Sequence, residues 1–522
     1  MSESNRSDMP SSWSYASLDD LGVWAGGGTP SKSTPEFWTN GTVPWVSPKD
    51  MKSFEIHDTE DHITEEAVHS STASHLPAGS VLVVTRSGIL RHSLPVAVTR
   101  VDVAVNQDLK ALKPYPEFVP DYVAYALRSD AQRILHACVK DGTTVQSVEF
   151  SEFKQFRIPV APAKEQQRIA DVLDELLSDL DAGVEALRRA QAKLALYRAS
   201  ALKAAVQGDL SAEWRRQNPN AEPASVLLQR ILIERRQRWE QGQLRKFKAA
   251  CKTFPANWKS KYKEPAAPDT TNLPELPEGW CWASFDQIAE IQGGLQKTPD
   301  RAPTHNHYPY LRVANVLRGS LDLHELHRFE LTNHELGRLR LKTGDLLIVE
   351  GNGSRSEIGR CAVWAGQVAD CVHQNHIIRL RPWCGMHSQY LDRYLNSPIG
   401  QTAIQLVASS TSGLYTLSVG KIQKLAVALA PTAEQEQISE TIAEQISIIE
   451  HVQVDLKSKI QSVGSLRQSI LRHAFTGQLV PQDPNDEPAS ELLRRIAEER
   501  TASAMKKVNP RKPATKRKKP EK

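Results

Sequence analysis

Two long segments of the chain place apolar or small residues at intervals that alternate between four and three positions. These segments cover residues 169–204 and 438–473, and the second is interrupted by polar Gln445, Lys459 and His473. Alternating spacings of four and three are typical of a helix that buries a narrow seam against another helix. We therefore predict two long helices with the following seam residues: Ile169, Leu173, Leu180, Leu187, Leu194, Ile438, Ile442, Ile449, Leu456 and Leu466.

Proline and glycine mark the ends of both predicted helices. Pro162 and Pro431 stand where a helix-opening proline belongs. Gly208 and Gly477 stand where a helix commonly stops. Each helix then has about 44 residues and spans roughly 65 Å at 1.5 Å per residue. Because no small domain buries a helix of this length alone, each seam needs a helical partner.

The chain is an internal duplication. The sequence from 162 to 208 reappears from 431 to 477 without a gap, and fainter similarity links 13–27 with 280–294. Each half is thus a diverged globular block followed by a helical block. We expect internal pseudo-twofold symmetry, with the long helices antiparallel and the globular blocks at their opposite ends. The alternative is that the seams belong to a core or to an interface between copies of the chain.

Each globular block combines short strands and many turns with one or two helices. Short helices are predicted near 120–128 and 388–396. Strands are predicted at Ser80–Thr85, Pro95–Val98, Asp345–Val349 and His376–Leu380. This mixture indicates an α+β fold class for both blocks.

Composition narrows the class of protein. The chain has 522 residues, a net charge of +4 and a mean hydropathy of −0.44, as expected for several ordinary folded domains. No run approaches the ~18 apolar residues that span a bilayer, and no secretory signal is recognised. The six cysteines form no CxxC pair, which argues against a zinc ribbon and suits a reducing, cytoplasmic environment.

Positive charge is concentrated in two segments. Residues 228–263 contain eleven Lys and Arg against two Glu, and residues 501–522 contain nine against one. Such segments either bind a phosphate-rich partner or form solvated helix faces and tails.

Polar, turn-rich loops of both blocks carry candidate recognition chemistry. Arginine can bind guanine edges, Asn and Gln can bind adenine edges, and Ser, Thr and Lys can bind phosphates. Equivalent loops with different residues in the two copies suit two readers of different sequences. The candidate DNA-binding residues are Lys32, Arg86, Ser87, Arg91, Thr143, Gln146, Lys297, Arg312, Asn315, Asn352, Ser354, Arg355 and Tyr415.

The sequence lacks the common catalytic motifs. It has no GxxxxGK[ST] phosphate loop, no HExxH motif and no GxSxG motif, and its histidines show no metal-ligand spacing. Asp121, Glu152 and Lys154 match the PD…ExK pattern of metal-dependent nucleases. However, Asp121 opens a predicted helix, and the aligned positions of the second half are not acidic. We therefore predict no catalytic or metal-binding residue and keep a nuclease as the alternative.

Several motifs, in their order along the chain, resemble one known family. The run 26–51 is similar to the opening of a target-recognition domain in the specificity subunits of type I restriction–modification systems. The run 276–294 is similar to the opening of a second such domain. The Pro-x-x-Glu-Gln helix starts at 162 and 431 and the Glu-Pro-Ala-Ser segments at 222 and 487 resemble that family's spacer regions.

This resemblance implies a DNA-binding subunit without catalysis of its own. Each target-recognition domain would bind one half of a bipartite, asymmetric DNA site, and the antiparallel spacer helices would set the gap. Two modification subunits, which bind S-adenosylmethionine, and two restriction subunits, which use ATP and Mg²⁺, would methylate adenine and cleave DNA in host defence. The chain itself would bind no cofactor and no membrane, and would be associated with the nucleoid.

The resemblance also implies domain boundaries. We expect target-recognition domains at 11–161 and 280–430, spacer helices at 162–252 and 431–500, a Pro-rich linker at 253–279 and a basic disordered tail at 501–522. A further alternative is a structural coiled-coil scaffold whose globular ends bind protein.

Overall fold

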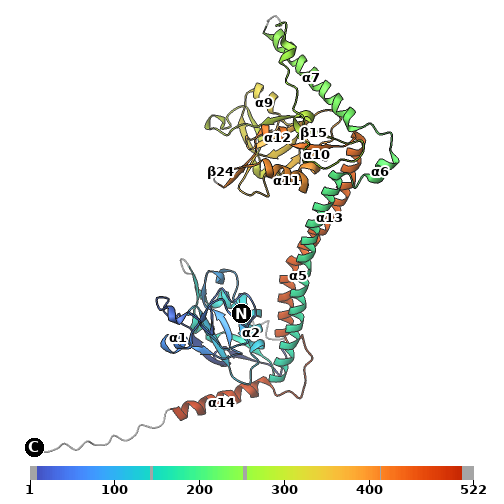
Figure 1. Cartoon of the computed structure of the whole chain (residues 1–522). Helices are drawn as coiled ribbons and strands as arrows, with labels where there is room; N and C mark the ends of the chain where they lie inside the picture. Colours follow the sequence, from blue (N-terminus) through green and yellow to red (C-terminus); the bar gives the residue numbers. More distant parts are fainter. Residues whose placement is uncertain (1–8, 141–144, 251–254, 412, 508–522) are drawn as a thin grey trace, which may run out of the picture. The chain divides into compact units, whose positions relative to one another are not determined.

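The computed structural model describes residues 9–140, 145–250, 255–411 and 413–507. The chain divides into two compact units. The first unit comprises Met1–Leu187 and Lys457–Lys522, and the second comprises Arg188–Leu456. Each unit therefore contains one globular block and part of both long helices (Figure 1).

The two long helices form as predicted. Helix α5 spans Ala163–Gln207 and helix α13 spans Thr432–Phe475, with 45 and 44 residues. Each begins directly after a proline, whose missing N–H is no loss at a helix start. Each ends before a glycine in the left-handed conformation, Gly208 at φ 83° and Gly477 at φ 73°.

Within each unit, α5 and α13 run antiparallel. In the first unit, the beginning of α5 and the end of α13 share one hydrophobic cluster, and Arg467 pairs with Asp181. In the second unit, the end of α5 and the beginning of α13 share another cluster, and Arg198 donates to Glu450 at 3.1 Å. The two ion pairs occupy equivalent positions of the repeat, so both units use the same helix pairing.

One predicted seam position is wrong. The other nine predicted seam residues are buried or half-buried, but the Leu466 side chain is 50% exposed. The seam passes instead through the following residue, Arg467, which turns inward to reach Asp181. The aliphatic part of an arginine covers apolar surface while its charged end binds a carboxylate. An apolar pattern therefore does not reveal this seam position.

The first globular block is built around a five-stranded sheet. Its strand order is β2 (Gly22–Gly26), β11 (Leu109–Pro114), β7 (Val81–Val84), β9 (Val96–Thr99) and β4 (Glu55–Ile56). A second sheet has the order β5 (His62–Ile63), β3 (Val43–Val46), β10 (Val103–Val105) and β6 (His75–Leu76). Alternate residues of β7 belong to two different cores, which explains why all four are buried. The helices are α1 (Glu65–Ser70), α2 (Pro120–Ser129), α3 (Ala131–Cys138) and α4 (Phe150–Gln155).

The second globular block repeats this arrangement. Its main sheet has the order β16 (Ala289–Gly293), β23 (Ile377–Pro382), β19 (Leu346–Val349) and β21 (Cys361–Val363). Its second sheet has the order β18 (His327–Glu330), β17 (His307–Leu311) and β22 (Val372–His373). Helices α8 (Phe285–Ile288), α9 (Asn333–Leu339), α10 (Ser388–Asn396), α11 (Pro398–Val407) and α12 (Val419–Lys424) complete it. The predicted α+β blocks and their duplication are confirmed.

The first and last strands of each block pair with each other. Strand β1 (Ser14–Ser17) is antiparallel to β14 (Arg157–Val160), and β15 (Cys281–Ser284) is antiparallel to β26 (Ala426–Leu429). Because β14 and β26 lead directly into α5 and α13, this pairing fixes where each long helix leaves its block.

A shorter helix completes each unit. Helix α14 (Ala489–Lys507) packs on the first block and α7 (Ala224–Ala249) packs on the second, while the short α6 (Ala212–Gln217) precedes α7. Both docked helices make the same two contacts, a backbone hydrogen bond and an ion pair. The hydrogen bonds join Ala489 N to Ser12 O (2.9 Å) and Ala224 N to Gly279 O (2.8 Å), and the ion pairs are Arg500–Asp20 (3.0 Å) and Arg235–Asp286 (3.1 Å).

Helix α14 continues beyond the predicted start of the basic tail at 501. The residues after Thr501 include alanine, methionine and lysine, which favour helix. The helix therefore extends to Lys507. Residues 508–522 lie outside the described part of the chain. Among the described residues, no helix has the length and apolar character needed to cross a membrane.

A buried glutamate in the first turn of α5 joins three segments of the first unit. Glu165 Oε1 accepts hydrogen bonds from Trp13 Nε1 at 3.1 Å and from Gln482 Nε2 at 2.5 Å. Trp13 precedes the first strand of the block, and Gln482 follows the end of α13. Burial raises the pKa of Glu165, and these hydrogen bonds oppose that rise.

The equivalent glutamate of α13 has a charged partner. Glu434 accepts hydrogen bonds from Trp280 Nε1 at 2.8 Å and from Ser211 Oγ at 2.6 Å, and it pairs with Arg215. Ser211 and Arg215 follow the end of α5. Each unit thus uses one buried carboxylate to bind a globular block, a helix start and a helix end.

We expect Glu434→Ala to destabilise the second unit by about 3–5 kcal/mol, because it leaves the largely buried Arg215 unpaired. The matched variant Glu165→Ala removes only neutral partners and should cost about 1–3 kcal/mol. Thermal unfolding, with hydrogen exchange to assign the loss to a unit, measures both. Equal losses in the two variants would contradict this difference.

Candidate nucleic-acid interface

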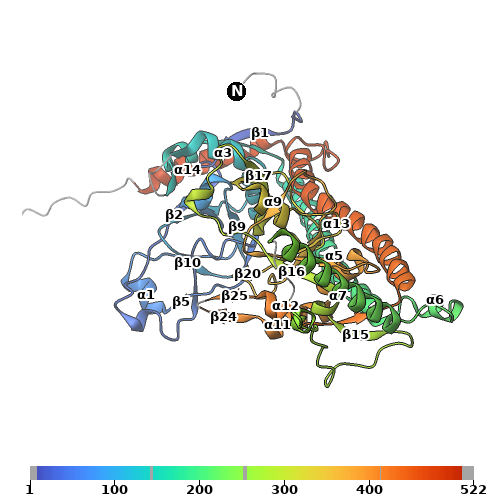
Figure 2. The same ribbon diagram turned by 90° about the horizontal axis from the view of Figure 1, so that it is seen from above.

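Each unit carries a small three-stranded sheet that presents predicted site residues. The first small sheet has the order β12 (Val139–Lys140), β13 (Gln146–Val148) and β8 (Arg86–Ser87). The second small sheet has the order β20 (Gly351–Asn352), β25 (Leu414–Thr416) and β24 (Ser409–Thr411). Its three strands are labelled next to one another in Figure 2. Both sheets are attached in the same way, by Val148 N to Thr85 O and by Leu417 N to Glu350 O, each at 2.8 Å.

The first small sheet brings four predicted residues together. Arg86 is exposed on β8, and Ser87 caps the short helix η3 (Gly88–Arg91). Arg91 Nε donates to Gln146 Oε1 at 3.1 Å, which links η3 to β13. Gln146 is only 6% exposed, so it orients Arg91 more than it faces solvent. Thr143 lies outside the described residues.

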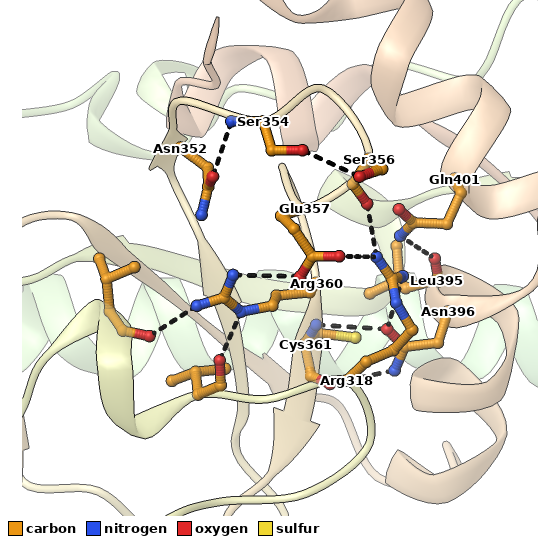
Figure 3. A network of polar contacts seen from close by, with 12 residues as sticks. Arg318, Asn352, Ser354, Ser356, Glu357, Arg360, Cys361, Leu395, Asn396 and Gln401 are labelled. Carbon is orange, nitrogen blue, oxygen red and sulfur yellow. Dashed lines mark hydrogen bonds and ion pairs between the residues drawn. The ribbon is translucent and has the colours of Figure 1, made fainter. Parts of the chain in front are cut away.

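The second small sheet brings together four others. Asn352 lies opposite Tyr415 in the β20–β25 pairing. The Asn352 side chain accepts the Ser354 N–H at 2.8 Å, which shapes the turn that follows β20 (Figure 3). Ser354 and Arg355 are exposed on this turn. A hydroxyl, a guanidinium, an amide and an aromatic ring therefore lie on one small surface.

Four predicted residues lie outside the small sheets and the turns that adjoin them: Lys32, Lys297, Arg312 and Asn315. Lys32 is exposed in the segment between β2 and the short helix η2 (Pro35–Phe37). Lys297 is exposed and lines a cavity of about 720 Å³. Arg312 forms an ion pair with Glu325 at 3.2 Å.

The prediction of Asn315 as a base-contacting residue is wrong. Asn315 is 3% exposed and ends the short helix η6 (Val313–Asn315). Its Nδ2 donates to the carbonyls of Asp322 and Glu325 at 2.8 and 3.0 Å, and its Oδ1 accepts the Arg312 N–H at 2.8 Å. Backbone groups thus bond to both the oxygen and the nitrogen of the side-chain amide. They reach it because the segment that follows η6 folds back over this helix.

A polar network beside the second small sheet was not predicted. Asn396 Nδ2 donates to Cys361 O at 3.0 Å and to Asp392 Oδ1 at 2.9 Å (Figure 3 shows Asn396 and Cys361). Burial raises the pKa of Asp392 to about 6 and that of the Cys361 thiol well above its usual value. The contact between Asn396 and Cys361 joins segments 35 residues apart, so no local pattern of the sequence indicates it.

The nuclease alternative finds no support in the geometry. Asp121 accepts from Arg100 at 2.7 Å, and Lys154 pairs with Asp19 at 2.7 Å. Asp121 lies in the first turn of α2 and Glu152 in the first turn of α4. Two of the three matching residues thus form structural ion pairs with other segments.

Sequence comparisons relate the chain to restriction–modification proteins. The family model of the type I restriction modification DNA specificity domain matches residues 10–187. The specificity subunit of a type I restriction enzyme of Escherichia coli is 43% identical over 161 residues, 31% of this chain and 40% of that protein. The EcoKI specificity subunit of Escherichia coli strain K12 is 24% identical over 414 residues, 77% of this chain and 76% of that protein. The match thus covers under half of the first relative and about three quarters of the second.

Two solved structures share the fold. One comes from work on complex assembly and conformational transition of the type I R-M system, and it has a TM-score of 0.61 and 16% sequence identity to this chain. The matched region covers 90% of this chain and 99% of that chain. The other is the HsdS subunit from Thermoanaerobacter tengcongensis, with a TM-score of 0.50, 16% identity, and coverage of 90% and 98%.

Asn315→Ala and Arg355→Ala should separate a structural from an exposed site residue. Asn315→Ala leaves buried backbone groups without partners and should destabilise the second unit by about 1–3 kcal/mol. Arg355→Ala changes an exposed side chain and should alter stability by less than about 0.5 kcal/mol. Urea unfolding of the two variants measures both. A loss at Arg355 as large as that at Asn315 would show that Arg355 has a structural role.

Proposed function

Because the chain belongs to the specificity-subunit family of type I restriction–modification systems, we propose that it is the DNA sequence-recognition subunit of such a complex. One observation carries this proposal. The same small sheet occurs in both units and is attached to its block by the same backbone hydrogen bond, but its exposed side chains differ between the units. Two copies of one scaffold with different surfaces suit the recognition of two different half-sites.

The chemistry of the small sheets fits base recognition. Arg86 and Arg91 in the first unit and Arg355 in the second have the donor geometry that binds guanine O6 and N7. Asn352 can bind adenine, and the hydroxyls of Ser87 and Ser354 can bind phosphates. Because the two sets differ at equivalent positions, the DNA site is bipartite and asymmetric. Double-stranded DNA is the partner, which places the protein at the nucleoid in the cytoplasm.

The long helices have two roles in this proposal. Their continuous length sets the gap between the half-sites, and their surfaces bind two modification subunits. Large apolar residues on these helices are exposed and offer contact surface to a partner. Tyr197 is 54% exposed in the second unit, and Leu466, at the equivalent position of the repeat, is 50% exposed in the first. The equivalence of these two exposed positions suits one partner subunit for each unit.

In this proposal the chain itself carries no catalysis. The modification subunits hold S-adenosylmethionine and methylate adenine, and two restriction subunits use ATP and Mg²⁺ to cleave unmodified DNA. The residues of the chain bind DNA and position these subunits. This division of labour suits the ion-paired environment of Asp121 and Lys154 described above.

Co-expression with the modification subunit of its own system, followed by mapping of methylated adenines across the host genome, tests the proposal. The expected result is one split motif with a fixed gap. A stable complex that methylates no such motif would contradict the proposal and favour a scaffold that binds protein.

The gap should depend on helix length. A seven-residue heptad inserted after Arg189 and after Ser458, at equivalent points of the repeat, keeps the seam in register and adds about 10 Å. This equals about three base pairs at 3.4 Å each, so methylation at the original gap should fall at least about tenfold while the half-site sequences stay the same. Lys193→Gln, an exposed change without insertion, should keep the original gap. Unchanged spacing in the insertion variant would contradict the role of the helices.

A further inference from the structure

The turn that follows β20 is exposed but held from one side. Residues 353–356, here called the 353–356 loop, are all exposed, and a side chain at Gly353 would meet open space. The Ser354 and Ser356 hydroxyls lie 2.9 Å apart. Among the described residues, no hydrogen bond or ion pair of the Arg355 side chain is found. The loop thus presents Arg355 to solvent and needs support from its base.

Arg318 supplies the first part of this support. Its Nη2 donates to the carbonyl of Ser356 at 2.7 Å, across 38 residues of sequence. Its Nη1 donates to Asn396 Oδ1 at 3.4 Å. Asn396 is buried and also bonds to both the N–H and the carbonyl of Cys361. One guanidinium therefore connects the backbone of the loop to the end of α10 (Figure 3).

Glu357 and Arg360 supply the second part. The Glu357 carboxylate lies between two guanidiniums, 4.0 Å from Arg318 and 3.2 Å from Arg360. Arg360 donates to the carbonyls of Val316 at 2.6 Å and Val313 at 3.0 Å, and only 12% of its side chain is exposed. The carboxylate attracts both cations, and Arg360 ties the C-terminal end of the loop to η6.

The first unit holds its corresponding loop in a different way. There the segment after β8 forms the helix η3, which Ser87 caps and which Arg91 links to Gln146. Each unit thus has its own device for fixing the loop beside its small sheet. A change in one device should leave the other unaffected.

We propose that Arg318, Glu357 and Arg360 are positioning residues that fix the 353–356 loop, and so determine how strictly the second half of the DNA site is recognised. This inference rests on the proposed function. A loop that is already ordered pays less conformational entropy on binding, and it presents Arg355 and Ser354 in one geometry. A loosened loop contacts several base sequences with similar free energies, so discrimination falls.

The test compares methylation maps of the co-expressed complex. Arg318→Ala and Glu357→Gln should each reduce, by roughly tenfold, the preference for cognate over mismatched bases in one half of the motif. Arg318→Lys, which keeps the charge but not the forked geometry, should restore part of it. Arg86→Ala in the first small sheet identifies the opposite half. Arg340→Ala removes a surface ion pair with Asp370 in the same unit and serves as the control.

A second measurement follows the loop without DNA. Hydrogen exchange of the backbone amides of residues 353–357 in the full chain should become at least severalfold faster in Arg318→Ala and stay unchanged in Arg340→Ala. Loss of preference confined to one half of the motif, together with faster exchange, supports the inference. Equal losses in both halves, or unchanged preference in both variants, overturn it while leaving the proposed function intact. A wild-type complex that methylates no split motif overturns both.

Discussion

A buried carboxylate at the start of each long helix connects the segments on which the rest of the structure depends. Glu165 and Glu434 each accept a hydrogen bond from the tryptophan that opens a globular block. Each also accepts one from a side chain in the segment that follows the other long helix. A carboxylate removed from water is costly unless its oxygens are hydrogen-bonded. The start of one helix is therefore stable only beside the end of the other. The antiparallel pairing and the closure of each unit follow from this constraint.

The same scaffold is used twice, whereas its small sheets differ. The contacts that repeat are those of the helices: the ion pairs Arg467–Asp181 and Arg198–Glu450 between the long helices, and the ion pairs of α14 and α7 with their blocks. The contacts that do not repeat lie beside the small sheets. In the first unit a helical turn and Gln146 hold the loop, and in the second a carboxylate between two arginines does so. The loops have thus diverged on supports that are themselves local, so one loop can change without disturbing the helix pair.

Much of the scaffold was predictable from the sequence because it follows from periodicity and repetition. The spacing of Leu173 and Ile442 predicts helices, and Pro162 and Gly477 mark helix boundaries. The error at Leu466 arose because an arginine occupies the seam. The site was less predictable. Arg86 and Arg355 are exposed as expected, but Asn315 is a buried structural amide, because a loop that folds back over η6 leaves no trace in local sequence. The contacts of Arg318 were missed for the same reason, since their partners are brought together only by the folded chain.

The docked helices α14 and α7 close their units at equivalent junctions. The hydrogen bond from Ala489 to Ser12 joins the start of α14 to the segment before β1, and its counterpart from Ala224 to Gly279 joins the start of α7 to the segment before β15. The two junctions are structurally equivalent, although the first joins segments that are far apart in the sequence and the second joins neighbouring ones. The second unit is one continuous stretch of chain, whereas the first combines the stretches before and after it, so during synthesis the second can complete its fold before the first.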